Sequence, residues 1–339
     1  MRKLLNVLYI LDEDVYLKLD GLNVVITKEG KEAARVPFCN LEGIVCFNYM
    51  GCTPALMAKC AEEGVALNFI SPQGRFLAHV RGEIRGNIHL RREQFRKLES
   101  DKFCLELAKL SIGAKIQNSQ NYLKKQIREN KSLQVYLDTV IESMEANLAD
   151  IRAVDNIDSL RGIEGDSARS YFSIFDKLIL NPEYEFGGRS KRPPLDAVNA
   201  MLSYLYALLA IECESALESV GLDPFMGYLH TDRAGRPALA LDLMEEFRCY
   251  IVDRLVLNII NLRKINASEF EFRNGGVQMS DSAKKILLKE WQNRKKEIIN
   301  HPIIGEKVEL GLFPYVQARL LAKYLRGEME HYTPFVAKL

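Results

Sequence analysis

Over the first part of the chain, hydrophobic and polar positions follow the two-residue period of β-strands. Short alternating or β-branched segments are separated by turns, of which Asp20-Gly21 is the clearest. Thr53-Pro54 has the form of a helix N-cap followed by proline in the first turn, and Gly64 would end that helix. The pattern predicts one helix over 54–63 and strands over 16–19, 23–27, 43–47, 65–70 and 75–80.

From about residue 85 onward, apolar residues recur at three- and four-residue spacing, which is typical of packed helices. The predicted helices cover 90–128, 133–154, 159–178, 195–220, 239–264, 280–300 and 314–327. We therefore predict an α+β multidomain protein. A small β-rich amino-terminal domain, residues 1–85, would be followed by an all-α domain, residues 86–339.

The composition is that of an ordinary globular protein. The chain has 339 residues, 47% of them hydrophobic and 27% charged, which is enough for two domains with their own cores. Acids at positions 12 to 14 come too early for a signal peptide, and no apolar run reaches the roughly 18 residues of a membrane span. The seven cysteines include no CxxC pair, which favours reduced thiols. We expect a cytoplasmic protein without a membrane partner.

The formal net charge of +1 makes no overall case for nucleic acid, but the basic residues are clustered. Seven basic residues and two glutamates lie between Arg75 and Lys97. A second basic group, Arg189, Lys191 and Arg192, precedes two prolines. Local basicity of this kind is typical of a DNA path. The alternative, for either cluster, is solvated charge on loops and helix faces.

The stretch GYLHTDRAGRPALALDLMEEFR, residues 227–248, combines a histidine, arginines and acids. Asp242 and Glu245 are three residues apart, so they project from one face of a predicted helix that is otherwise apolar. Carboxylates in such a place are costly to bury unless a cation or a hydrogen-bonding partner compensates them. Imidazole with carboxylates suits a divalent metal ion, and nearby arginines suit a phosphate substrate.

A further acid, Glu164, lies between two glycines in RGIEGD, so a metal ion or a DNA backbone could approach it closely. Glu164, His230 and Glu245 could each supply one ligand to a common ion, for which Mg²⁺ or Mn²⁺ is suited. Each residue also has a simpler explanation. Glu164 could stabilise a helix amino terminus, His230 could be a structural hydrogen-bonding residue, and Glu245 and Glu246 could be exposed helix acids.

Four segments resemble the CRISPR-associated integrase family, the catalytic subunit that inserts new spacers into a CRISPR array. They are NLEGIVCFNYMGCTPALMAKCAEEGVALNFISPQGRFLA at 40–78, RGIEGDSARSYF at 161–172, FGGRSKRPPLDAVNAMLSYLYALL at 186–209, and the 227–248 stretch. They cover most of the chain in the family's order, and the sequence most resembles the type I-C branch. The resemblance implies that the β-rich domain dimerises and that the α-helical domain holds the catalytic metal and DNA sites.

By that resemblance, Glu164, His230 and Glu245 are the metal ligands, and Asp242 is an acid beside the site that supports catalysis. Whether Asp242 also touches the ion stays open at this point. Asn199 is expected to be structural. The expected DNA contacts are Arg189, Arg192, Arg233, Arg236 and Arg248, although Arg248 could equally form an ion pair with Glu245 one turn away.

The resemblance implies a metal-dependent DNA integrase and endonuclease that uses Mg²⁺ or Mn²⁺. A donor 3′-hydroxyl would attack the phosphodiester at a repeat boundary. The implied partners are double-stranded DNA (donor spacer and CRISPR repeat), a second copy of the chain, a small companion subunit and a donor-trimming nuclease. A stand-alone nuclease acting on branched DNA in repair, and a DNA-binding scaffold with a degenerate site, remain alternatives. For the tail 328–339, a disordered terminus is favoured over a docking peptide.

Overall fold

The structure is a computed structural model that describes residues 6–71, 76–80, 82, 88–230 and 233–338. The chain forms two compact units, residues 1–85 and 86–339. Three residues of the first basic cluster, Arg75, Arg81 and Arg85, lie outside the described residues.

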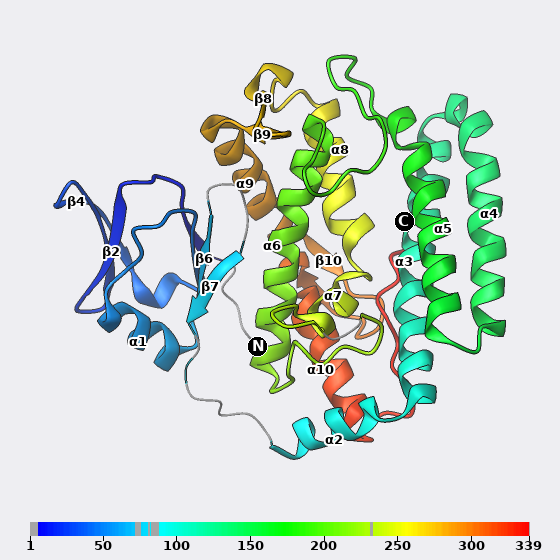
Figure 1. Ribbon diagram of the computed structural model, residues 1–339, viewed down its shortest axis with the longest axis horizontal. Coiled ribbons are helices and arrows are strands. Elements are labelled where there is room, and N and C mark those ends of the chain that lie inside the picture. Colours follow the sequence, from blue (N-terminus) through cyan, green and yellow to red (C-terminus); the bar gives the residue numbers. More distant parts are fainter. Residues whose placement is uncertain (1–5, 72–75, 81, 83–87, 231–232, 339) are drawn as a thin grey trace. The chain divides into compact units, whose positions relative to one another are not determined.

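The amino-terminal unit contains two small sheets and one helix (Figure 1). The first sheet has the order β1-β5-β6-β7, in which β1, β5 and β6 are parallel and β7 is antiparallel to β6. The second is the antiparallel meander β2-β3-β4. The strands are β1 Val7–Ile10, β2 Val15–Asp20, β3 Asn23–Lys28, β4 Lys31–Pro37, β5 Gly43–Cys46, β6 Ala66–Ile70 and β7 Phe76–Val80.

The helix α1, Pro54–Glu63, has the predicted bounds because both of its ends are encoded locally. The hydroxyl of Thr53 accepts the backbone N–H of Leu56, and Gly64 ends the helix in the left-handed conformation with φ of 69°. Strands β1 and β4 are additions to the predicted set. In β4 most side chains are exposed, so the alternation of apolar residues that marks a strand is missing.

The second unit is helical, which confirms the predicted fold class of a β-rich region followed by a helical domain. In Figure 1, α3, α4 and α5 lie side by side. Two short antiparallel hairpins, β8–β9 and β10–β11, are added to the helices. The helices are α2 Ile88–Leu98, α3 Asp101–Glu129, α4 Gln134–Ala153, α5 Ile157–Ser173, α6 Ala197–Ser219, α7 Ala238–Met244, α8 Arg254–Asn261, α9 Asp281–Lys295 and α10 Phe313–Leu325; the strands are β8 Phe270–Arg273, β9 Gly276–Met279, β10 Ile298–Asn300 and β11 Lys307–Glu309.

The predicted continuous helix over 239–264 is wrong. Helix α7 ends at Met244, residues 245–247 form a turn, and a π-helical segment, Arg248–Asp253, leads into α8. Nearly all of these residues are buried, so the apolar pattern continues through the break and hides it. Such π-helical insertions re-aim the neighbouring side chains and are frequent at functional sites.

Helix α6 bears on the expectation that no apolar run is long enough for a membrane span. It is the one helix among the described residues that is long and apolar enough, with 23 residues. However, 67% of its most apolar window is buried inside the protein. It also carries the fully buried Asn199, so it is best explained as a core helix.

The carboxy-terminal tail is packed against the helical unit, so the prediction of a disordered terminus is wrong. The side chains of Tyr332, Phe335 and Ala337 are buried. Asn118 of α3 donates to the carbonyl of Phe335 and accepts the N–H of Ala337. Figure 1 shows the tail, in red, running along α3.

Candidate metal centre and phosphate-binding site

The three predicted metal ligands come together from three segments of the helical unit. Glu164 lies on α5, His230 precedes α7, and Glu245 directly follows α7. The Nε2 atom of His230 lies 3.9 Å from Oε1 of Glu245. Lys115 of α3 contacts Glu164, and its Nζ atom lies 2.9 Å from Oε2 of Glu245. Glu245 thus lies beside the imidazole of His230 and is bridged to Glu164 by the ammonium of Lys115.

Asp242 orients the imidazole rather than pointing at the same volume. Its Oδ2 atom accepts the backbone N–H groups of Tyr228 and Leu229 at 2.6 and 3.0 Å. Its Oδ1 atom accepts the backbone N–H of His230 at 3.1 Å and lies 2.6 Å from that residue's Nδ1. With Asp242 acting as an acceptor throughout, Nδ1 donates, and Nε2 is the ring nitrogen that faces Glu245. Carboxylate–histidine pairs of this kind are typical of metal sites.

Gly227 allows the loop that carries His230 to close on α7. A Cβ atom at this position would lie 2.7 Å from both the carbonyl carbon and the Cβ of Ala238, and 2.9 Å from Oδ2 of Asp242. No real side chain tolerates such contacts without a shift of backbone. Glycine is therefore required for the close approach that brings the loop's N–H groups to Asp242.

Arg161 fixes the same loop to α5. Its Nη2 atom donates to the carbonyl of Leu229 at 2.7 Å, and its Nη1 donates to Asp158 at 2.9 Å. Arg161 lies one turn before Glu164, so this bond sets the distance between the helix that carries Glu164 and the loop that carries His230.

The Glu245 side chain is buried, with 3% of the residue exposed, yet it is an anion. Burial by itself would raise its pKa. The charges of Arg248, whose Nη2 lies 2.9 Å from Oε1, and of Lys115 outweigh that effect and hold the pKa of Glu245 at about 2. The ion pair with Arg248 confirms the alternative that the helical spacing allowed.

Lys115 was not found by sequence reasoning. Burial disfavours its charge, but the carboxylates of Glu245 and Glu164 more than offset this effect, and the pKa of Lys115 is raised. The signal in the sequence is a lysine on a helix face whose other members, among them Ser111, Ile112 and Ser119, are buried. A charged residue at such a position needs a partner of opposite charge.

The residues present suit a divalent cation. The Oε2 atom of Glu245 is buried and has no hydrogen-bond partner among the described residues, because Lys115 approaches it without hydrogen-bonding geometry. One imidazole nitrogen and two carboxylates form the mixed N/O set that Mn²⁺ and Mg²⁺ accept, with further positions for water or phosphate.

The next residue, Glu246, faces the opposite side and holds the tail. Its carboxylate accepts the Tyr332 hydroxyl at 2.6 Å, the Phe335 N–H at 2.7 Å and the Gln317 amide at 2.8 Å. Burial raises the pKa of Glu246 to about 7, although these donors lower it. Because Glu245 and Glu246 are both buried, the alternative of exposed helix acids is wrong.

The predicted DNA-contacting arginines fall into two groups. The guanidinium groups of Arg189 and Arg248 are engaged inside the protein: each lies over the Tyr206 ring, and Arg189 also donates to Asn199 at 2.7 Å. This geometry favours a supporting role for both residues over direct DNA contact. It also agrees with the structural role expected for Asn199, which is fully buried.

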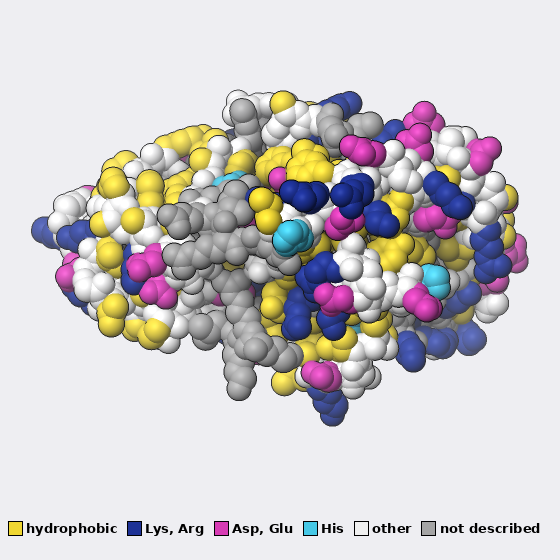
Figure 2. All heavy atoms as spheres, turned by 90° about the horizontal axis from the view of Figure 1, so that it is seen from below, with side chains coloured by type: hydrophobic (Ala, Val, Ile, Leu, Met, Phe, Trp, Pro, Cys, Tyr) yellow, Lys and Arg dark blue, Asp and Glu magenta, His cyan; other side chains and the backbone are white. Residues whose placement is uncertain are grey.

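Arg192, Arg233 and Arg236 form the second group. Arg192 and Arg233 are exposed and Arg236 is partly exposed. Burial and the charges of Arg233, Arg192 and Arg161 lower the pKa of Arg236, whereas Asp242 acts in the opposite direction. Elsewhere basic and acidic side chains are mixed: on the face in Figure 2, Lys and Arg lie among Asp and Glu.

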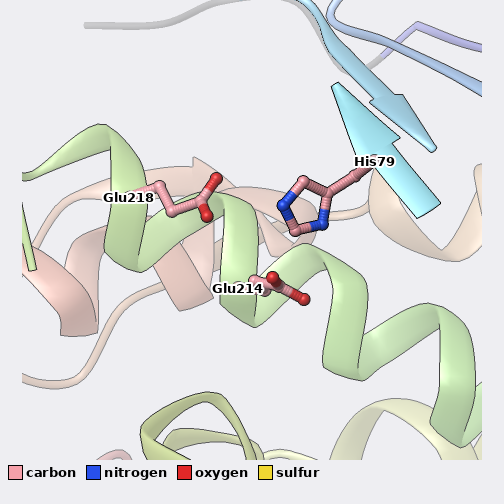
Figure 3. A group of neighbouring side chains, drawn as sticks. All are labelled: His79, Glu214 and Glu218. Carbon is pink, nitrogen blue, oxygen red and sulfur yellow. The ribbon is translucent and has the colours of Figure 1, made fainter. Parts of the chain in front are cut away.

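A second set of acidic side chains lies on α6. Figure 3 shows Glu214 and Glu218 one turn apart, projecting from the same side of the helix. His79, drawn with them, is on β7 of the other unit. Within the helical unit the pair therefore contributes two carboxylates, which do not by themselves make a metal site.

Comparisons with known proteins agree on one family. The model of the family "CRISPR associated protein Cas1" matches residues 8–293. A "CRISPR-associated endonuclease Cas1 1" of Chlorobaculum tepidum is 43% identical over 341 residues, 99% of both chains. A "CRISPR-associated exonuclease Cas4/endonuclease Cas1 fusion" of Geobacter sulfurreducens is 33% identical over 98% of this chain and 60% of its own length.

Solved structures share the fold. A casposase bound to integration product superposes with a TM-score of 0.82 at 23% identity, covering 96% of this chain and 92% of that one. A chain of a Cas6-RT-Cas1–Cas2 complex gives a TM-score of 0.85 at 22% identity, over 98% of this chain and 36% of that one. At these identities the likeness is one of fold.

Proposed function

The chain belongs to the CRISPR-associated Cas1 family, and from this premise we propose that it is a metal-dependent DNA integrase and endonuclease of CRISPR adaptation. It inserts new spacer DNA at a CRISPR repeat by attack of a donor 3′-hydroxyl on the boundary phosphodiester. The observation that carries the proposal is that Glu245 lies beside His230 and is bridged to Glu164 by Lys115, with Asp242 orienting the imidazole. From the resemblance of its sequence motifs, we propose that the chain is of the type I-C branch.

Glu164, His230 and Glu245 hold the metal ion, Mg²⁺ or Mn²⁺, and Asp242 acts through the histidine. When bound, the ion polarises the scissile phosphate and stabilises the charge of the transition state. Asp242 keeps the hydrogen on Nδ1, so Nε2 stays available as a ligand. Arg248 helps to keep Glu245 ionised inside the protein, which preserves an anionic ligand at neutral pH.

The arginine cluster Arg192, Arg233 and Arg236 binds the DNA backbone. The positive charges of Arg233 and Arg192 act unfavourably on the charge of Arg236, and a bound phosphate would offset this effect. Phosphate contacts of this kind release counterions, so DNA affinity should fall steeply with salt.

Joining both ends of a donor requires two active sites, so we propose that the chain acts as a homodimer that forms through its amino-terminal β-rich unit. A small companion subunit of the Cas2 kind joins the assembly, as the name of the fold relative suggests. The Cas4–Cas1 fusions make a donor-trimming Cas4 nuclease a further partner. A cytoplasmic location, where these partners and the DNA substrate would be met, is part of the same proposal.

The test is strand transfer of a labelled duplex donor into repeat DNA, with Mn²⁺ and the companion subunit present. Glu164→Ala, His230→Ala, Asp242→Ala and Glu245→Ala should lose the joined product while the purified proteins remain folded. Glu145→Ala, which removes an exposed acid of α4, is the matched control. Full activity in all four variants would refute the metal site. Cleavage of branched DNA without joining would instead favour the stand-alone nuclease.

A further inference from the structure

Lys115 lies between two acidic side chains of the candidate metal centre. Its ammonium contacts Glu164 on α5 and Glu245 after α7, and 17% of its side chain is exposed. These are two of the three proposed ligands, and they come from different segments. The side chain therefore bridges the same carboxylates that a metal ion would bridge.

The two carboxylates would repel each other if nothing compensated them. Glu245 is almost fully buried, and its other neighbour, Arg248, reaches only Oε1. Between Glu164 and Glu245, Lys115 supplies the shared positive charge. Lys115 therefore joins α3 to a carboxylate of α5 and to a carboxylate of the turn after α7.

A divalent ion that binds both carboxylates has to approach their oxygens to about 2 Å. The Lys115 ammonium, which lies against both carboxylates, would then be repelled by the positive charge of the ion. Lysine suits such a temporary role, because its charge sits on a flexible four-carbon stem and can move without a change in the helix.

We propose that Lys115 is a displaceable internal cation of the metal centre. It holds Glu164 and Glu245 together in the metal-free protein and leaves them when the metal ion binds, so it lowers the apparent metal affinity and stabilises the empty site. The proposal rests on the proposed metal site. It makes Lys115 a positioning residue. Its effects on metal affinity and on the stability of the metal-free protein can therefore be measured without the DNA reaction.

The experiment uses the full-length chain with Lys115→Met, which keeps the length of the side chain and removes its charge. Mn²⁺ affinity is measured by titration calorimetry, and melting temperature is measured in EDTA and in Mn²⁺. Lys115→Met should bind Mn²⁺ about tenfold more tightly than the wild type. In EDTA it should melt at least about 5 °C lower, and added Mn²⁺ should restore most of that loss.

Two variants make the outcome specific. Lys125→Met removes a lysine that pairs with Glu129 on the surface of the same helix and should change neither quantity. Lys115→Arg keeps the charge and should restore the melting temperature in EDTA. If Lys115→Met does not fold without metal, the same prediction is tested by refolding the variant at a series of Mn²⁺ concentrations. The folded fraction should then depend on the Mn²⁺ concentration.

Equal or weaker Mn²⁺ binding by Lys115→Met, when Glu245→Gln abolishes binding by the wild type, would overturn the role of Lys115 and leave the metal site intact. No binding by the wild type, or binding unaffected by Glu245→Gln, would overturn the metal site and this inference with it. Tighter binding together with a less stable metal-free protein supports both.

Discussion

Glu245 and Glu246 are consecutive residues whose carboxylates face opposite sides of one turn. Glu245 meets Lys115, Arg248 and the imidazole of His230, whereas Glu246 accepts three hydrogen bonds from α10 and the carboxy-terminal tail. The tail is therefore joined to the backbone that positions a proposed metal ligand. The break in the helix after Met244 makes this arrangement possible, because it places both acids in a turn.

Glu246→Gln tests how strongly the tail is held. All three partners of Glu246 donate hydrogens, so the amide of glutamine would turn a donor toward donors. We expect unfolding free energy to fall by about 1–3 kcal/mol and the tail to become more sensitive to carboxypeptidase. Urea denaturation and timed digestion measure these two effects. Glu328→Gln, which alters a surface pair with Arg326, should change neither; equal behaviour of the two variants would contradict the role of Glu246.

Asp242→Asn tests the orientation of His230. Asparagine keeps the shape of the side chain but offers one acceptor oxygen where two now serve the three N–H groups and Nδ1. Changes to the partner that orients a metal-binding histidine weaken metal binding by about 10–100-fold, and we expect a loss of Mn²⁺ affinity in that range. Calorimetric titration measures it. Asp150→Asn, on the surface of α4, is the control, and wild-type affinity in Asp242→Asn would show that the aspartate does not act through the histidine.

Much of this fold is readable from local sequence, and the reasons are visible in particular residues. Helix α1 was predicted to its exact bounds because Thr53 and Gly64 encode its ends. The break after Met244 was missed because the buried residues on both sides continue a helical pattern. Strand β4 was missed because its charged, exposed side chains carry no alternation.

The site divides in the same way. Glu164, His230, Asp242 and Glu245 lie in motifs, so the sequence names them without knowing their separation. Lys115 belongs to no such motif: it meets Glu164 and Glu245 through contacts of 49 and 130 residues in chain separation (115 to 164, and 115 to 245), which only the packing of α3 reveals. The packing of the tail on Glu246 is a long-range contact of the same kind.

Gly227→Ala tests the close approach of the histidine loop to α7. A methyl group at this position would overlap the backbone and side chain of Ala238, so the loop has to move away from Asp242. We expect joined product to be lost and unfolding free energy to fall by about 1–3 kcal/mol, as in other overpacked sites. Gly113→Ala is a matched control, because a Cβ on that glycine of α3 meets nothing within 4 Å and alanine favours a helix. Equal activity of Gly227→Ala and the wild type would show that the loop tolerates the shift.

The pH dependence of stability should reveal a buried histidine that is not one of the proposed ligands. His301 is fully buried, its ring lies 4.6 Å from that of Phe313, and its Nδ1 accepts the N–H of Ile303. Burial lowers its pKa to about 4, against an ordinary value of 6.5. Between these two pH values the unfolded chain binds a proton that the folded protein refuses, so stability falls as the pH decreases. Each pKa unit corresponds to about 1.4 kcal/mol, so the loss on going from pH 7.5 to pH 5 should be about 2 kcal/mol.

His301→Leu removes the titrating group while keeping the site apolar, and its stability should depend less on pH over this range by that amount. His331→Leu, at an exposed position of the tail, should follow the wild type. Urea denaturation at pH 7.5, 6 and 5 gives the unfolding free energies to be compared. The slope of the unfolding free energy against pH should distinguish the variants even if His301→Leu is less stable at every pH. Parallel curves for the wild type and His301→Leu would mean that His301 takes up a proton in the folded protein as readily as in the unfolded chain.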